Sequence, residues 1–185
     1  MFGRTIKIAL FTLLTYLLQA TTAQYISIAD VAPNIALAFI AIVSVACGRK
    51  YTFVMSLTIG YLMEIMLTML NYINLILYPV AAMLGAFVFS DKSERKLEEL
   101  RSREKSTRQL NPHIRTPLCA FLSICVLEGF HLIYVNITGV QLDNGHLGRA
   151  AIDVVYTTML AAVCQFPVRA WLGIYRQKKE QQQQE

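Results

Sequence analysis

Residues 117–135 of the chain read PLCAFLSICVLEGFHLIYV, an apolar run interrupted by one glutamate and one histidine. At a rise of about 1.5 Å per residue, a helix of this length crosses most of a hydrocarbon core about 30 Å thick. Backbone polar groups find no water in that core, so a spanning segment must satisfy them within itself as a helix. The stretch therefore predicts a transmembrane helix.

Five further apolar runs predict helices of the same kind. They cover residues 8–28, 31–47, 51–70, 75–89 and 150–172. The whole chain is 55% hydrophobic and 16% charged, with a mean hydropathy of +0.45, a composition typical of membrane proteins. We therefore expect an all-α integral membrane protein of six transmembrane helices, forming a single membrane domain over residues 1–175.

The distribution of lysine and arginine predicts the orientation of these helices. Of the 17 basic residues, only Arg149 falls on the opposite side of the six-helix map from the rest. Because basic residues accumulate in cytoplasmic loops, both termini are expected in the cytoplasm, with the chain in the inner membrane. The net charge of +5 could suggest nucleic acid as a partner, but the basic residues cluster at the ends of apolar runs. Anionic lipid attracts them there, so we expect membrane lipids and no nucleic acid as partners.

Two polar segments lie outside the predicted spans. Residues 91–115 are of mixed charge, and Arg95, Glu99 and Arg103 in them have the four-residue spacing of neighbours on a helix surface. We interpret them as a cytoplasmic helix and loop, favouring a solvated hairpin over a docking site for a cytoplasmic partner. Residues 176–185 end in a glutamine run and are expected to form a disordered cytoplasmic tail.

Four ionisable residues remain inside the predicted spans: Glu64, Glu128, His131 and Asp153. Such groups are costly in hydrocarbon and normally face a bundle interior, a wet cavity or a partner helix. Glu128 and His131 are three residues apart and share a helix face. One hypothesis is a single polar locus formed by all four, at or beyond the membrane midplane, for interaction or as a pocket. The alternative is that a hydroxyl, an amide or interfacial water satisfies each group separately.

The sequence gives little sign of catalysis or metal binding. Glu128 and His131 match one Glu-x-x-His motif of the di-iron helix bundles, which require a second copy that is absent here. The four cysteines lack the spacing of a zinc site or a disulfide framework. The motifs of zinc proteases, serine hydrolases and phosphate-binding loops are also missing from the sequence. We therefore expect a protein that is not an enzyme and carries no cofactor or catalytic metal.

A group of small residues in the fourth predicted span allows two helices to approach closely. The group is Ala81, Ala82, Gly85 and Ala86, which contains two pairs of small residues at four-residue spacing. We interpret these residues as a packing face within the chain.

Several short motifs resemble the rod shape-determining protein MreD family of bacterial cell-wall elongation. The resemblance is carried by Pro33-Asn34 at the start of the second helix, the basic turn Gly48-Arg49-Lys50, Gly60 and Glu64 in the third helix, and Tyr156-Thr157 through Pro167-Val168-Arg169 in the last. Length and helix number are also similar. The chain departs from the family in having Asn34 where Asp is usual, and in the longer, more charged segment 91–115.

The resemblance implies a non-enzymatic subunit of the cell-elongation complex, or elongasome. Such a subunit binds the single-span protein MreC and helps to couple a RodA-type glycosyltransferase and a class B penicillin-binding protein to MreB filaments. It would thereby help to regulate peptidoglycan synthesis and cell shape through protein-protein interaction, as a scaffold. The alternative is the vitamin-binding subunit of an energy-coupling-factor transporter, a six-helix fold to which MreD-like proteins are similar. Its pocket would open outward, where the four ionisable residues are expected, but the first helix lacks the alanine series usual in those subunits.

Overall fold

Helices account for most of the residues that the computed structural model describes, which are 2–28, 31–66, 72–89, 111–139 and 143–173. They are α1 (Phe2–Thr21), the 3-10 helix η1 (Ala23–Ile26), α2 (Ile35–Cys47), α3 (Arg49–Met66), α4 (Ile73–Phe89), α6 (Pro112–Ile137) and α7 (Asn144–Trp171). These ranges contain no β-strand, and Ile28 and Val31 form one isolated bridge. The predicted all-α class is therefore confirmed.

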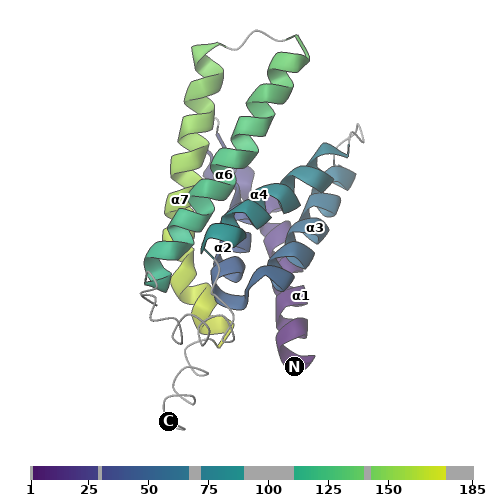
Figure 1. Cartoon of the computed structure of the whole chain (residues 1–185), viewed down its shortest axis with the longest axis vertical. Coiled ribbons are helices and arrows are strands. Elements are labelled where there is room, and N and C mark those ends of the chain that lie inside the picture. Colours follow the sequence, from purple (N-terminus) through teal and green to yellow (C-terminus); the bar gives the residue numbers. More distant parts are fainter. Residues whose placement is uncertain (1, 29–30, 67–71, 90–110, 140–142, 174–185) are drawn as a thin grey trace, which may run out of the picture.

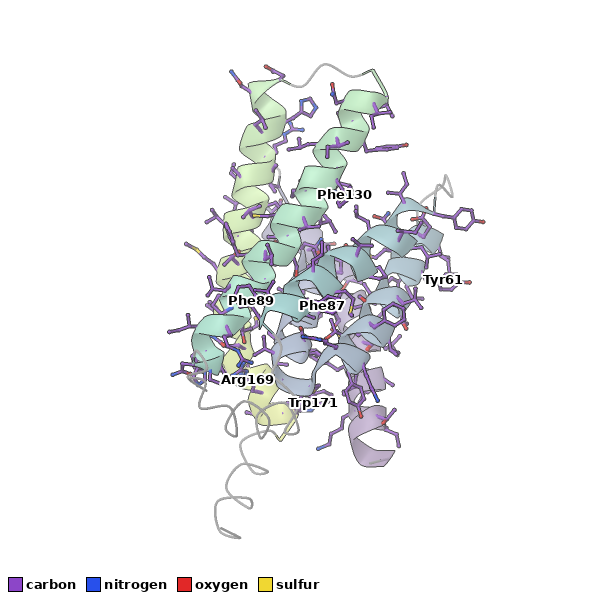
Figure 2. All side chains as sticks on the ribbon, viewed as in Figure 1. Tyr61, Phe87, Phe89, Phe130, Arg169 and Trp171 are labelled. Carbon is purple, nitrogen blue, oxygen red and sulfur yellow. The ribbon has the colours of Figure 1, made fainter. Side chains whose placement is uncertain are left out.

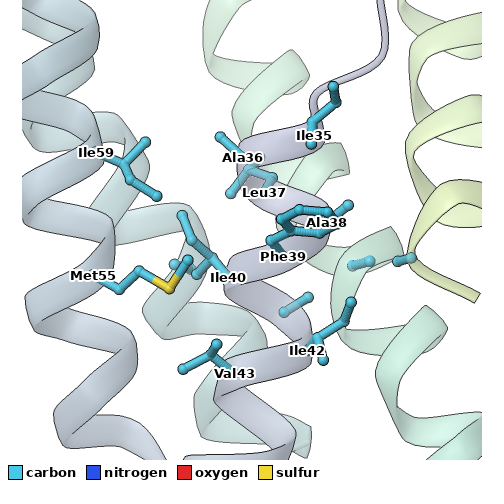
Figure 3. Packing of buried hydrophobic residues seen from close by; sticks show 14 of the residues in the cluster. Ile35, Ala36, Leu37, Ala38, Phe39, Ile40, Ile42, Val43, Met55 and Ile59 are labelled. Atoms are coloured by element: carbon cyan, nitrogen blue, oxygen red, sulfur yellow. The ribbon is translucent and has the colours of Figure 1, made fainter. Parts of the chain in front are cut away.

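The short helix α2 lies at the centre of the fold. Every residue from Ile35 to Val45 is buried, and α2 contacts α1, α3, α4, α6 and α7. A helix that is apolar on all sides must be enclosed by other elements. Figure 3 shows this packing, with Met55 and Ile59 of α3 against one side of α2. With 13 residues, α2 is about 20 Å long, less than a hydrocarbon core, but its neighbours separate it from the surroundings.

The two longest helices, α6 and α7, form a hairpin that extends beyond the other helices (Figure 1). With 26 and 28 residues, both are long and apolar enough to cross a membrane. Only 28% and 22% of the residues in the most apolar stretch of each helix are buried. Residues such as Phe130, Ile133 and Val163 are exposed. The core helix of a soluble protein would instead bury such residues. The exposed apolar faces therefore suggest association with a membrane.

Helix α6 begins earlier than the hydropathy pattern predicts. Its first residue is Pro112, and the side chain of Asn111 caps it by accepting a hydrogen bond from the His113 N–H at 3.2 Å. Proline is favoured in a first turn, where no N–H is needed. Pro117, which we expected near the helix start, therefore lies inside the helix, and residues 112–115 are helical. The rest of the predicted loop and the tail 176–185 lie outside the described residues.

The first helix ends earlier than predicted, at Thr21. Hydropathy cannot detect this end, because the next residues are also mostly apolar. A tertiary contact and a tight turn determine the path of the chain instead. The Tyr156 hydroxyl of α7 donates to the Ile26 carbonyl at 2.6 Å. In the turn, Ile28 and Val31 exchange two backbone hydrogen bonds of 3.0 Å. The chain thus turns back into the bundle as α2.

The small residues of α4 are buried, and Gly85 among them lies against α6. Ala81, Ala82, Gly85 and Ala86 are all buried. A Cβ atom at Gly85 would fall on the Ser123 hydroxyl and lie 3.1 Å from the Cys119 carbonyl oxygen, so only glycine fits this contact without a shift. Gly85 therefore lets α4 approach α6 closely within the chain.

The first and last described helices share one end of the molecule. Helix α1 begins there, and α7 ends there at Trp171 (Figures 1 and 2). The rings of Trp171 and Phe11 lie 5.7 Å apart, and Phe11 in turn stacks on Phe39 of α2 at 5.3 Å. These aromatic contacts fix the end of α7 against α1 and α2.

Candidate polar pocket between α6 and α7

A pocket of about 300 Å³ is lined mainly by the last part of α6 and the first part of α7. These two parts form the upper half of the α6–α7 hairpin in Figure 1. Its wall is formed by Val31 and Ala32 before α2, by Glu128, His131, Leu132 and Val135 of α6, and by His146, Arg149, Ala150 and Asp153 of α7. Three of the four ionisable residues singled out in the sequence thus line one pocket. His146 and Arg149 join them, and the sequence analysis did not assign these two to a site.

Asp153 is held in place by a chain of hydrogen bonds that reaches the start of α2. The Thr157 hydroxyl donates to Asp153 at 2.8 Å and accepts from the Asn34 N–H at 2.9 Å. The Asn34 side chain accepts from the Leu37 N–H at 3.0 Å, which caps α2, and its amide donates to the Tyr78 hydroxyl of α4 at 3.2 Å. Because each hydroxyl both donates and accepts, such a chain is mutually reinforcing. It connects α2, α4 and α7.

Glu128 and His131 face the pocket from α6 as a loose pair. The His131 Nδ1 atom lies 3.6 Å from a Glu128 carboxylate oxygen, and the His131 side chain is 40% exposed. This distance exceeds that of a charge-assisted hydrogen bond. The Glu128 carboxyl is also close enough to interact with that of Asp153 across the pocket. The two carboxyl groups therefore come from different helices and share one space.

Glu64 does not line this pocket. It is 2% exposed, and its two carboxylate oxygens accept hydrogen bonds from the Tyr72 N–H at 2.7 Å and the Asn74 N–H at 3.1 Å. The first N–H groups of a helix have no partner inside the helix, so a carboxylate there satisfies them and interacts favourably with the helix dipole. Glu64 thus caps α4 from α3, and it is satisfied separately from the other three.

Gln19 of α1 is a further polar residue that the sequence analysis missed. Its side-chain oxygen accepts from the Ala36 N–H at 3.0 Å, and its amide donates to the Pro33 carbonyl at 3.5 Å. Together with Asn34, it satisfies the backbone at the start of α2. Nothing in the spacing of Gln19 indicates this contact, because the contact depends on how α1 packs.

The other end of the α6–α7 pair contains two buried arginines. Arg115 and Arg169 are 5% and 4% exposed. Arg169 lies near the lower end of α7 in Figure 2 and donates to the Pro112 carbonyl at 3.0 Å and the Thr116 hydroxyl at 2.6 Å. In the sequence, these two arginines only indicated the topology, and their burial was not predicted.

Gln165 of α7 supplies a hydrogen bond that a backbone carbonyl of α6 does not receive within its own helix. Pro117 has no N–H, so the carbonyl of His113, four residues earlier, has no donor from its own helix. The Gln165 amide donates to that carbonyl at 3.2 Å. The position of Gln165 therefore has a structural explanation, because its amide satisfies this carbonyl.

The charged side chains of the pocket are suited to binding a ligand. No three His, Cys, Asp or Glu side chains among the described residues converge as a metal site would require. Glu128, Asp153 and Arg149 can instead form ion pairs with a charged ligand.

Comparisons with known proteins identify no relative of this chain. No family model matches the chain, and neither a curated protein nor a solved structure is significantly similar to it.

Proposed function

We propose that the chain is a six-span protein of the bacterial inner membrane and a non-enzymatic scaffold subunit of the cell-elongation complex. In this role it binds an MreC-like single-span protein and helps to regulate peptidoglycan synthesis by a RodA-type glycosyltransferase and its class B penicillin-binding partner. The membrane part of this proposal draws support from the exposed apolar faces of α6 and α7.

The observation that carries the proposal is the position of Pro33 and Asn34. This pair is the first motif by which the sequence resembles the MreD family, where it opens the second helix. Here Asn34 caps α2 and is bonded to α4 and α7. Glu64, from the third-helix motif, caps α4. Both motifs thus stabilise the start of a helix, as expected for residues that maintain the fold of a scaffold subunit.

The six-span topology also has support from the geometry. The start of α1 and the end of α7 lie at the same end of the molecule, as an even number of spans requires. The short α2 is enclosed, so it need not match the thickness of the hydrocarbon core. Arg149, the only basic residue expected outside, lies on the first part of α7, far from that end.

Co-purification tests the partner directly. The tagged full chain, solubilised in mild detergent from the membranes of its native host, should retain a single-span MreC-like protein that mass spectrometry identifies. The Thr157→Ser variant keeps the hydroxyl that bonds to Asn34 and should retain the same partner. Retention of a vitamin in stoichiometric amount, with no such partner, would contradict the scaffold role.

The pocket favours one second candidate, the vitamin-binding subunit of an energy-coupling-factor transporter. Its volume of about 300 Å³ is at the lower limit of small-molecule sites, which run from roughly 300 to 1,000 Å³. We rank this function second because such sites are mostly apolar with few polar groups, whereas five ionisable side chains line this one. A vitamin retained through purification would reverse the ranking.

A further inference from the structure

The pocket between α6 and α7 carries its charges at two levels. On α7, Arg149 and Asp153 are four residues apart and share a face, separated by about one turn. On α6, Glu128 and His131 are three residues apart. In both helices the carboxylate lies nearer the centre of the bundle, and the basic residue lies nearer the connection between the two helices. The pocket therefore has an acidic level and a basic level.

In the described ranges, no ion pair with a lysine or arginine is formed by the two carboxyl groups of the acidic level. Glu128 of α6 and Asp153 of α7 line the same pocket, and two carboxylates that face each other there repel. Asp153 accepts from the neutral Thr157 hydroxyl at 2.8 Å, and Glu128 reaches His131 only at 3.6 Å. A positively charged donor placed between the carboxylates would bond to both and remove their repulsion.

The basic level has no anionic partner within the described part of the chain. Among the residues that the structure describes, Arg149 forms no ion pair with a carboxylate. The Nδ1 atom of His146, three residues before Arg149, is buried and has no hydrogen-bond partner in those ranges. A buried polar nitrogen without a partner is costly and marks a place where a ligand group can bond. Both side chains line the pocket.

We propose that this pocket binds a small zwitterion with a primary ammonium group and an anionic group. The ammonium lies between Glu128 and Asp153, and a phosphate or carboxylate of the ligand lies against Arg149 and His146. The aliphatic side chains Leu132 and Val135 in the wall fit a short hydrocarbon link between the two charges. The same chemistry occurs in a phosphatidylethanolamine headgroup and in a free amino compound such as phosphoethanolamine.

The composition of the described part of the wall disfavours two related ligands. A quaternary ammonium is usually held by aromatic rings, and among the described residues no Phe, Tyr or Trp lines this pocket. It also has no N–H to donate to the carboxylates. A bare metal ion is disfavoured because no three ligating side chains converge among the described residues. The ligand class goes beyond the scaffold role, and it can be tested on the purified chain without any partner.

Calorimetric titration of the purified full chain in detergent tests the proposal. Phosphoethanolamine should bind about tenfold or more tightly than phosphocholine, because only its ammonium donates to the carboxylates. If the source is a lipid, the free compound shows no binding, and nanodiscs with phosphatidylethanolamine raise the melting temperature relative to phosphatidylcholine nanodiscs. Equal responses to the amine and choline forms in both formats, or no response in either, would overturn the proposal.

Variants locate the site within the chain. Glu128→Gln, Asp153→Asn and Arg149→Gln should each weaken binding, or reduce the lipid response, by about tenfold or more. Arg149 is exposed, so its variant remains informative if a carboxylate variant fails to fold. The control is Glu64→Gln, which alters a buried carboxylate outside the pocket and should leave the affinity unchanged. An unchanged affinity in Arg149→Gln together with Glu128→Gln would place the ligand elsewhere and refute the site.

Discussion

The backbone N–H of Asn34 donates to the Thr157 hydroxyl at 2.9 Å, joining residues that are 123 positions apart in the chain. Thr157 is 0% exposed, so water cannot replace this bond. Through Thr157 the start of the central helix is connected to Asp153 in the pocket wall at 2.8 Å. One hydroxyl therefore links the core of the bundle to the candidate site.

Replacing Thr157 by valine should destabilise the protein. Valine keeps the shape of threonine but removes the hydroxyl that accepts from the Asn34 N–H at 2.9 Å and donates to Asp153 at 2.8 Å. An unsatisfied buried group costs about 1 to 3 kcal/mol. Thermal unfolding in detergent, followed by circular dichroism, should show a lower melting temperature for Thr157→Val than for Thr157→Ser. Equal stability of the two variants would show that the hydroxyl does not contribute.

Pairs of carboxylate variants distinguish the pocket from the cap of α4. Glu128 and Asp153 interact, so the effects of Glu128→Gln and Asp153→Asn on stability should deviate from additivity by about 0.5 to 3 kcal/mol. Glu64 is bonded to Tyr72 and Asn74 instead, so Glu64→Gln and Glu128→Gln should add within about 0.5 kcal/mol. Strong coupling in the second cycle would place Glu64 in the pocket after all.

The sequence predicts the helices better than it predicts the contacts between them. Each of the six apolar runs has a helix, because hydrophobic length is a local property. The last residue of α1 differs from the prediction because the path after it depends on the Tyr156–Ile26 bond. The first residue of α6 differs because it depends on the cap at Asn111. Neither contact produces a hydropathy signal.

The candidate site was predictable only in part, for a similar reason. Glu128, His131 and Asp153 stand out because charge is rare in apolar runs. Glu64 stands out equally, but only the turn between α3 and α4 shows that it caps a helix. The spacing of His146, Arg149 and Asp153 places them along one helix, whereas their position opposite Glu128 depends on the packing of α6 against α7.

The bond between Gln165 and the His113 carbonyl should matter only while Pro117 is present. In the natural chain, Gln165→Leu leaves that carbonyl without its donor and should lower the free energy of unfolding by about 1 to 3 kcal/mol. Pro117→Ala supplies a helix N–H to the same oxygen. Chemical denaturation should therefore show a smaller loss for Gln165→Leu in the Pro117→Ala background. The same loss in both backgrounds would show that Gln165 does not compensate for the missing N–H of Pro117.

Two helix glycines should respond oppositely to alanine. Gly85→Ala forces its Cβ against Ser123 and Cys119 and should destabilise the contact between α4 and α6 by about 1 to 3 kcal/mol. Gly129→Ala places its Cβ where no atom lies within 4 Å, so the higher helix propensity of alanine should stabilise α6 by up to about 1 kcal/mol. Melting temperatures of the two variants measure the contrast. A stabilised Gly85→Ala variant would show that the helices are not in close contact there.

Labelling of single introduced cysteines in intact cells tests the six-span arrangement most directly. The substitution Asn144→Cys lies at the start of α7, next to the pocket, and should react with an impermeant thiol reagent before the cells are permeabilised. Leu100→Cys and Glu180→Cys should react only after permeabilisation, because the basic segments around them are expected in the cytoplasm. The chain with only its own four cysteines provides the background signal. Labelling at 100 or 180 in intact cells, or protection at 144, would contradict the topology and the outward position of the pocket.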